Sequence, residues 1–279
     1  MHPLNPFRGP HDLASLPGLA PHIRDGVTLD FGDPVAVRAL NRALLEAQYG
    51  IAGWDFPADH LTPAVPGRLD YLLHVADLID APGPLDVLDL GTGASCIYPL
   101  LGAAALGWRF LASDIDPGSV ATAQAIAAAN PRLAIDVRHQ PDPSACFHGV
   151  VGRGEVLDLV VCNPPFYADA AEAAAEAARK GGGGAFAGKG NELHCDGGEH
   201  GFLHRMARES RDWGHRVFWF SALVAKKEHV GGLERSLRKL GATRVEVLPL
   251  AVGQKVARVV AWTHLPEAQQ REWRRFRWG

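Results

Sequence analysis

LDVLDLGTG, residues 85–93, is the stretch of this sequence that decides the fold. Residues 85–90 form a short, mostly apolar run that ends at a glycine, as expected of a buried strand followed by a turn. Gly91 and Gly93 let the backbone approach a ligand with no Cβ atom in the way. Together with Asp89 they make the pattern D-x-G-x-G. The stretch predicts a first strand of an α/β sheet with a ligand-binding loop at its carboxyl end.

Predicted strands and helices alternate from this point onward, which is typical of a parallel sheet with helices on both faces. The strands are expected at 85–90, 110–113, 133–137, 156–161, 217–224, 244–248 and 256–262. The helices are expected at 96–106, 119–129, 198–213 and 226–240. The last two strands have no helix between them, so we expect them to form an antiparallel hairpin.

Two further residues decide which ligand the glycine loop suits. A dinucleotide fingerprint would need a third glycine where Cys96 stands, so the loop fits S-adenosylmethionine better. Asp114 ends the second predicted strand, 23 residues beyond Gly91. A carboxylate at this place can accept hydrogen bonds from both ribose hydroxyls of a nucleoside cofactor. These residues predict a methyl-donor site.

Asn163-Pro164-Pro165-Phe166 follows a buried apolar run, 157–162. The two prolines stiffen the turn and lack N–H groups, while their carbonyls remain free to accept. An Asn side-chain oxygen next to such a carbonyl gives two acceptors aimed at one point, with an aromatic face beside them. This turn suits a planar amine with two N–H bonds, such as N6 of adenine.

The glycine loop, Asp114 and the Asn163 turn lie in order at the carboxyl ends of neighbouring strands, where open α/β sheets bind ligands. We therefore expect an α/β, Rossmann-like fold of the class I S-adenosylmethionine-dependent methyltransferases. Its mostly parallel seven-stranded sheet, with an antiparallel last strand, should occupy residues 81–279. Residues 1–80 should add an N-terminal helical extension, in which Asp33-Pro34 opens one helix and 67–79 forms another.

A long loop of about 168–195 is expected within this domain, beside the Asn163 turn. The glycine run 181–184 has high chain entropy, so residues of about 180–193 should be mobile. Such a loop could act as a lid or be a surface insertion, and the sequence leaves both open.

Composition and motifs argue against membrane, secreted and metal-binding proteins. The apolar fraction of 47% and the charged fraction of 21% are ordinary for a globular protein. No apolar run of membrane-spanning length and no signal peptide occur, so we expect a cytoplasmic protein without membrane contact. The four cysteines form no C-x-x-C pair and the 13 histidines form no H-E-x-x-H motif, so no metal site is expected.

The net charge of −3 does not indicate nucleic-acid binding, but the charge at the C-terminus does. Four arginines there alternate with Trp273, Phe276 and Trp278; they are Arg271, Arg274, Arg275 and Arg277. They can contact phosphates while the aromatic rings stack on bases. Alternatively, this is a solvated basic tail whose aromatic residues pack back on the domain.

The chain resembles the RlmF family of ribosomal large-subunit adenine-N6 methyltransferases, and is similar to the eukaryotic methyltransferase-like-16 proteins. The most specific match is Ser95-Cys96-Ile97-Tyr98-Pro99. Further matches are Met1-His2 with Asn5, 33–40, 65–71, 90–100, 162–166, Glu192-Leu193, 197–199 and Gly253-Gln254-Lys255 leading to Ala261-Trp262.

The resemblance implies roles for individual residues. Arg68 would hold the carboxylate of the donor's methionine part, Gly91 and Ser95 would line its pocket, and Asp114 would bind the ribose. Residues 163–166 would receive the adenine, and the N-terminal extension would bind RNA and cover the donor site. The substrate would be 23S rRNA or a large-subunit assembly intermediate, with no obligate protein partner. Family members place basic residues at the extreme N-terminus to bind RNA. This chain departs from that pattern, since Leu4 and Phe7 stand there and Arg8 is the only Arg or Lys before Arg24, so Arg8 is the N-terminal candidate for RNA binding.

Other functions stay open at this point. The Asn-Pro-Pro-aromatic turn also occurs in enzymes that methylate other RNAs, adenine in DNA or glutamine in proteins. A nucleotide-dependent oxidoreductase is disfavoured by Cys96, and an RNA-binding module without activity is disfavoured by the intact turn at Asn163.

Overall fold

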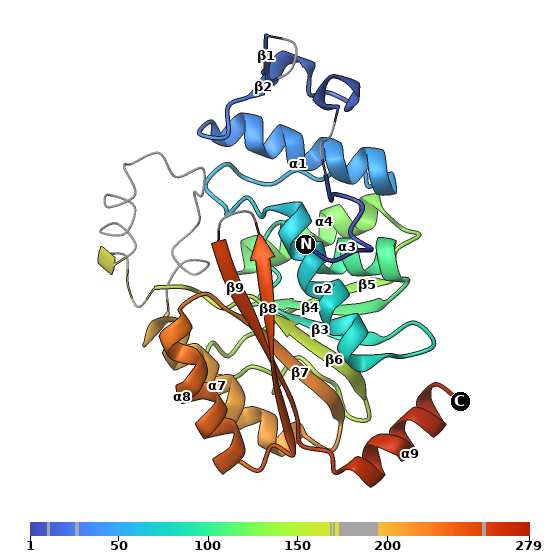
Figure 1. The fold of residues 1–279 in the computed structure, drawn as a ribbon, viewed down its shortest axis with the longest axis vertical. Helices are drawn as coiled ribbons and strands as arrows, with labels where there is room; N and C mark the ends of the chain where they lie inside the picture. The colour runs from blue at the N-terminus through green and yellow to red at the C-terminus, as the bar shows by residue number, and fades with distance from the viewer. Residues whose placement is uncertain (10–11, 26–27, 168, 170, 173–194, 253–254) are drawn as a thin grey trace.

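A seven-stranded sheet with strand order β5-β4-β3-β6-β7-β9-β8 forms the centre of the molecule (Figure 1). The computed structural model describes residues 1–279 except for 10–11, 26–27, 168, 170, 173–194 and 253–254. The strands are β3 (Asp86–Leu90), β4 (Arg109–Asp114), β5 (Ile135–His139), β6 (Leu157–Cys162), β7 (Val217–Val224), β8 (Arg244–Val252) and β9 (Lys255–Thr263). Only β9 runs against its neighbours β7 and β8. The predicted mostly parallel sheet with a closing hairpin is confirmed.

Helices cover both faces of this sheet, because successive side chains of each buried strand point to opposite faces. On one face, Val87 and Val161 share a core with α2 (Val65–Ile79), α3 (Ile97–Leu106) and α4 (Pro117–Ala129). On the other face, Leu88 and Val160 pack with α7 (Gly198–Trp213) and α8 (Lys227–Lys239). Strands β6 and β7 are buried along their whole length, which explains their continuous apolar sequences.

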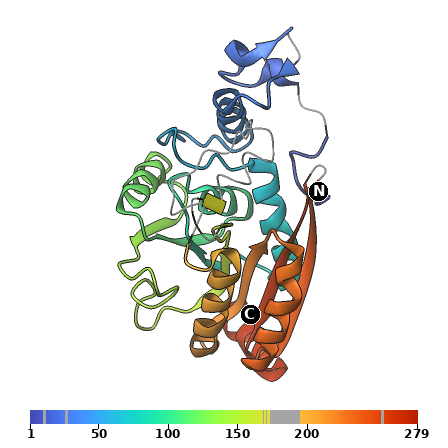
Figure 2. The same ribbon diagram turned by 90° about the vertical axis from the view of Figure 1, so that its left-hand side faces the viewer.

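The N-terminal elements lie at one end of the molecule (Figures 1 and 2). Helix α1 (Pro34–Tyr49) begins as expected, with the Asp33 side chain accepting a hydrogen bond of 2.9 Å from the Val35 N–H. Before it come two 3-10 turns, Leu13–Ser15 and Ala20–His22, and a small antiparallel pair, β1 (Ile23–Arg24) with β2 (Thr28–Leu29). The sequence did not predict this pair, because two-residue strands carry no periodic signal.

The first residues dock on α2. The backbone N–H of His2 donates to Asp70 at 2.6 Å, and the Asn5 side chain donates to the Pro66 carbonyl at 2.9 Å. Asp70 is fully buried. This segment therefore holds the first turns of α2, the helix that carries Arg68.

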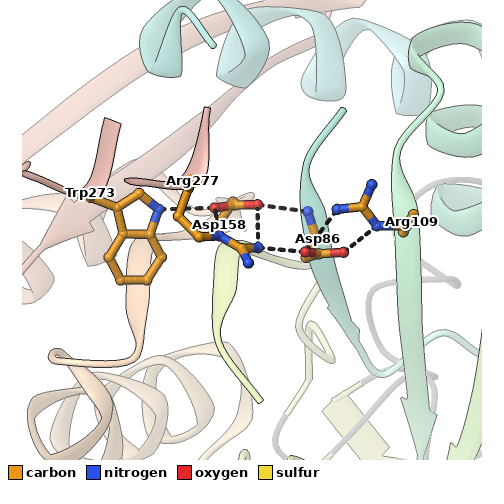
Figure 3. A network of polar contacts seen from close by, with 5 residues as sticks. All are labelled: Asp86, Arg109, Asp158, Trp273 and Arg277. Carbon is orange, nitrogen blue, oxygen red and sulfur yellow. Dashed lines mark hydrogen bonds and ion pairs between the residues drawn. The ribbon is translucent and has the colours of Figure 1, made fainter. Parts of the chain in front are cut away.

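Helix α9 (Glu267–Arg277) lies at the amino ends of β3 and β6. Figure 3 shows its contacts: Arg277 reaches both Asp86 and Asp158, and the Trp273 indole donates to Asp158 at 2.9 Å. Asp86 begins β3 and Asp158 is the second residue of β6, so α9 ties the amino ends of two adjacent strands together.

No helix in the described part of the chain is long and apolar enough to span a membrane.

Candidate functional site

A cavity of about 540 Å³ opens at the carboxyl ends of β3, β4 and β6. Its size falls in the range of small-molecule and cofactor sites, about 300–1,000 Å³. Arg68, Gly91, Gly93, Ser95, Asp114 and Asn163 all line it. The structure thus brings these six predicted site residues together around one space.

The glycine loop is fastened to the end of β4. The N–H groups of Gly91 and Thr92 both donate to the Ser113 carbonyl at 2.9 Å. Gly91 and Gly93 have φ of 77° and 61°, in the left-handed region where a Cβ atom is unfavourable. Cys96, which ends the loop before α3, has a left-handed φ of 51° although it is not glycine. The loop therefore contains three left-handed backbone positions, two at glycines and the last at a cysteine.

The Asp114 carboxylate is fixed at the cavity wall by backbone donors. Gly93 N–H donates to Oδ2 at 2.8 Å and Asp116 N–H donates to Oδ1 at 2.9 Å. A carboxylate offers about four acceptor positions on its two oxygens. This arrangement suits a ligand that offers two adjacent hydroxyl groups.

Arg68 connects two walls of the cavity. Its Nη1 atom lies 3.2 Å from both the Tyr98 hydroxyl and the Asn163 Oδ1 atom. Its guanidinium also lies 5.7 Å from the centre of the Tyr98 ring. Burial raises the pKa of Tyr98 to about 12, although the Arg68 charge opposes the shift. Tyr98 therefore stays neutral, and Arg68 supplies a positive charge at this wall.

The turn at Asn163 is supported from α2 and β7. The Cys162 N–H donates to the Tyr71 hydroxyl at 3.3 Å, and this hydroxyl lies 2.8 Å from Ser221 Oγ. Asn163 and Pro165 line the cavity. Pro164 is buried, and Phe166 is half-buried beside Tyr167, with 6.4 Å between the ring centres. The turn is thus held by buried groups on both sides.

Asp89 differs from the other predicted donor-site residues. Its side chain is fully buried and is absent from the cavity wall, whereas the next residue, Leu90, lines it. Neither carboxyl oxygen makes a hydrogen bond of normal geometry within the described part of the chain. Burial raises the pKa of Asp89 to about 7; the nearby Asp114 charge adds to the shift, while Thr92 and Arg68 reduce it.

Some cavity residues were not predicted. Gln140 follows β5 and lines the cavity, and its backbone N–H donates to the Asp114 carbonyl at 2.8 Å. Its position at the carboxyl end of a strand could have marked it as a site residue. Tyr98 lies within the matched 95–99 run but had no role assigned. Phe202 and Arg205 come from α7, about one helical turn apart, and no motif marks them.

Most of the expected loop of about 168–195 lies outside the described residues, because 168, 170 and 173–194 are not described. The described residues on either side of this segment meet, since the Cys195 N–H donates to the Tyr167 carbonyl at 3.1 Å. Cys195 and Asp196 line the cavity. The described residues Tyr167 and Cys195 therefore lie side by side at the edge of the site.

The arginines predicted to bind RNA lie in different surroundings. Arg8 is exposed, three residues beyond Asn5, which contacts the first turn of α2. Arg271 and Arg275 are exposed on α9, remote from the cavity. Arg274 donates to the Ile79 and Asp80 carbonyls, and Arg277 binds Asp86 and Asp158. Trp273 and Trp278 pack on Phe218, as the alternative interpretation of this tail expected.

Two histidines are spaced for a metal site. His200 and His204 are four residues apart on α7, with ring centres 4.3 Å apart. Across the described residues, no group of three or more His, Cys, Asp or Glu side chains is arranged to hold a metal ion.

The chain was compared with known proteins. Residues 1–266 match the profile of a family described as RNA methyltransferase. "Ribosomal RNA large subunit methyltransferase F" of Pseudomonas aeruginosa (strain LESB58) is 44% identical, with 100% of this chain and 92% of the relative covered. The protein of the same name from Yersinia enterocolitica is 41% identical, with 100% and 92% covered.

Solved structures show the same similarity. The human METTL16 catalytic domain in complex with MAT2A 3′UTR hairpin 1 superposes with a TM-score of 0.87 at 33% identity, covering 96% of each chain. The N-terminal domain of human METTL16 in complex with SAH gives a TM-score of 0.79 at 30% identity, covering 95% of this chain and 99% of that one.

Proposed function

Because this chain belongs to the RNA methyltransferase family, we propose that it transfers the methyl group of S-adenosylmethionine to N6 of an adenine in large-subunit (23S) rRNA. The observation that carries the proposal is the position of Asn163. Its Oδ1 atom lies on the same cavity as Asp114 and the glycine loop, and 3.2 Å from Arg68. An acceptor for an amine thus stands beside a pocket suited to a nucleoside donor.

The residues present fit the donor. Gly91 and Gly93 leave room for it beside the backbone, Asp114 offers acceptors for its ribose hydroxyls, and Arg68 offers a guanidinium for its carboxylate. Ser95 lines the same wall. Asp89 would act indirectly from beneath the loop, where it lies close enough to Thr92 and Arg68 for both to lower its pKa. When bound, S-adenosylmethionine supplies a methyl group on a positively charged sulfur, an electrophile that needs no metal.

The residues of the turn prepare the acceptor. The lone pair of adenine N6 is delocalised into the ring, so the amine is a poor nucleophile. N–H donation to Asn163 Oδ1 and to the Pro164 carbonyl would favour a pyramidal nitrogen whose lone pair points into the cavity. Phe166 would stack on the base, which must be unpaired or flipped out. Positioning and electrostatics would then carry the catalysis.

Three sets of residues would contribute to RNA binding. We assign residues 1–80 a role in covering the donor and gripping RNA, since Leu61, Pro63 and Arg68 from this part line the cavity. Arg8 would contact RNA beside α2. In the C-terminal cluster the exposed Arg271 and Arg275 would contact phosphates, while Arg274 and Arg277 would mainly hold α9 in place. The substrate would be 23S rRNA or a large-subunit assembly intermediate, and the reaction cytoplasmic.

A labelling experiment tests the function. The protein is incubated with S-adenosylmethionine labelled in its methyl group and with unmodified 23S rRNA, an unrelated hairpin RNA, DNA or a protein extract. We expect label mainly in rRNA, recovered as N6-methyladenosine. Label in the hairpin, in DNA or in protein glutamine, with none in rRNA, would overturn the assignment.

A further inference from the structure

We infer that Arg68 is a positioning residue for Asn163, so that binding of the donor and acceptance of the base are linked. The inference rests on the proposed function, in which Arg68 binds the donor carboxylate and Asn163 receives N6. Its basis is the shared atom: one guanidinium nitrogen, Nη1, lies 3.2 Å from Asn163 Oδ1 and 3.2 Å from the Tyr98 hydroxyl. Arg68 and Asn163 are 95 residues apart in the chain.

The contact decides which end of the Asn163 amide faces Arg68. A guanidinium can only donate hydrogen bonds, so the amide must turn its oxygen toward Arg68. An amide oxygen accepts two hydrogen bonds, which leaves one acceptor position for N6. If the amide flipped, its NH₂ group would face the base and oppose the N6–H donor. Arg68 therefore selects the productive orientation.

The backbone of the turn is fixed by the same helix. Tyr71 lies one turn after Arg68 on α2, and its hydroxyl accepts the Cys162 N–H at 3.3 Å. The Ser221 Oγ atom lies 2.8 Å from this hydroxyl and donates a hydrogen bond of 2.8 Å to the Val160 carbonyl. The two supporting side chains, Tyr71 and Ser221, are buried, and so is Cys162, which takes part through its backbone N–H. With the main chain held, rotation of the Asn163 side chain is the freedom that remains for Arg68 to set.

The guanidinium has capacity for a second acceptor. Within the described residues its hydrogen bonds are made by Nη1, whereas Nη2 and Nε make none. A guanidinium carries five N–H donors in a fixed plane. A carboxylate can thus bind Nη2 and Nε while Nη1 stays on Asn163, and a bound carboxylate would restrict the long Arg68 side chain. Donor binding would then also fix the orientation of the Asn163 amide. Because the coupling between the two sites is reciprocal, a base bound at Asn163 would in turn strengthen donor binding.

The test separates donor affinity from the transfer step. Arg68→Lys keeps the charge but offers a compact ammonium in place of the planar fork. Calorimetry measures the affinity for S-adenosylhomocysteine, and single-turnover kinetics measure methyl transfer to saturating 23S rRNA at saturating donor. We expect the dissociation constant to rise at least about tenfold and the saturated rate to fall at least about tenfold.

Asp114→Asn is the matched control, because it weakens a donor contact without touching Asn163. We expect it to raise the dissociation constant and to lower the saturated rate much less than Arg68→Lys does, because the Asn163 amide keeps its Arg68 contact. Tyr71→Phe is the complementary variant: it should lower the saturated rate while donor affinity stays unchanged.

The outcomes distinguish the positioning role of Arg68 from the proposed function. If Arg68→Lys raises the dissociation constant but leaves the saturated rate at the wild-type value, the positioning role is refuted and the proposed function stands. If Asp114→Asn slows the saturated rate as strongly as Arg68→Lys, the effect is a general misplacement of the donor, which also refutes it. If Arg68→Lys changes neither quantity, the donor role of Arg68 in the proposed function is wrong.

Discussion

The indole N–H of Trp54 donates a hydrogen bond of 2.9 Å to the carbonyl oxygen of Ser95. Trp54 is 1% exposed and lies between α1 and α2, whereas Ser95 belongs to the loop that lines the cavity before α3. This bond therefore fastens the N-terminal part of the chain to the donor loop.

Trp54→Phe should weaken donor binding. The substitution leaves the Ser95 carbonyl without its buried donor, which costs about 1–3 kcal/mol of stability. If about 1 kcal/mol of this appears in donor binding, the dissociation constant for S-adenosylhomocysteine rises about fivefold. Calorimetry measures it, and urea unfolding measures the stability. The control is Trp108→Phe, at a buried residue outside the cavity wall; an equal loss of affinity in this control would contradict the link.

Arg277→Met should destabilise the fold without affecting the cavity. Asp158 is fully buried and receives Arg277 at 3.1 Å (Figure 3). Removing one partner of a buried pair typically costs about 3–5 kcal/mol, and we expect roughly 2–4 because Arg277 is partly exposed. Urea unfolding measures the loss. Arg271→Met removes only a surface pair with Glu267, so it should change stability by less than about 1 kcal/mol. Equal stabilities of the two variants would contradict the role of Arg277.

Asp89 should make stability fall as pH rises. Burial raises the pKa of Asp89 from 3.8 to about 7, so the folded state holds a proton that the unfolded state has lost between these values. A group whose folded pKa is raised contributes stability below its unfolded pKa and loses it as pH rises through the folded value. Each pKa unit corresponds to about 1.4 kcal/mol, so Asp89 should account for roughly 2–4 kcal/mol across this window.

Asp89→Asn removes the titrating group while keeping the size of the side chain. Urea unfolding of both proteins at several pH values between 4 and 7.5 gives the difference in unfolding free energy. We expect the variant to gain stability relative to the wild type as pH rises. A constant difference across this range would show that Asp89 is ionised in the folded protein throughout.

The exposed arginines of α9 should contribute electrostatically to RNA binding. Arg271→Gln with Arg275→Gln removes two charges on the outer side of the helix. Each lost phosphate contact should reduce the salt dependence of log K by about 0.7–0.9. Fluorescence anisotropy with an rRNA fragment at several salt concentrations measures the slope. A slope equal to that of the wild type would assign RNA binding to other surfaces, such as Arg8 and residues 1–80.

The elements of the sheet were predictable because each is a short apolar run next to a turn signal. The expected strand 217–224 and helix 198–213 coincide with β7 and α7, and the other strands and helices of the sheet domain differ by a few residues at their ends. Asp89 shows the limit: adjacent strand residues face opposite ways, so a motif that contains Asp89 and Leu90 cannot place both on the cavity.

Contacts between distant segments could not be predicted at all. Trp54 with Ser95, Tyr71 with Ser221, and Arg68 with Asn163 each join residues that carry no shared local signal. Arg68 was implied by family resemblance, and its contact with Asn163 required the three-dimensional arrangement. The tail arginines show the same limit, since spacing cannot separate an arginine that faces solvent from one that binds a buried carboxylate.

Asn163 is expected to present N6 of an rRNA adenine to the donor, and analysis of the nucleosides of treated rRNA tests this role. Unmodified 23S rRNA is treated with wild-type protein or with Asn163→Ala at saturating donor, then digested to nucleosides and analysed by mass spectrometry. We predict N6-methyladenosine with the wild type and a yield at least about 100-fold lower with the variant, since the acceptor for N6 is lost even when saturating donor fills the pocket. A different methylated nucleoside, or a near-normal yield from Asn163→Ala, would contradict the account.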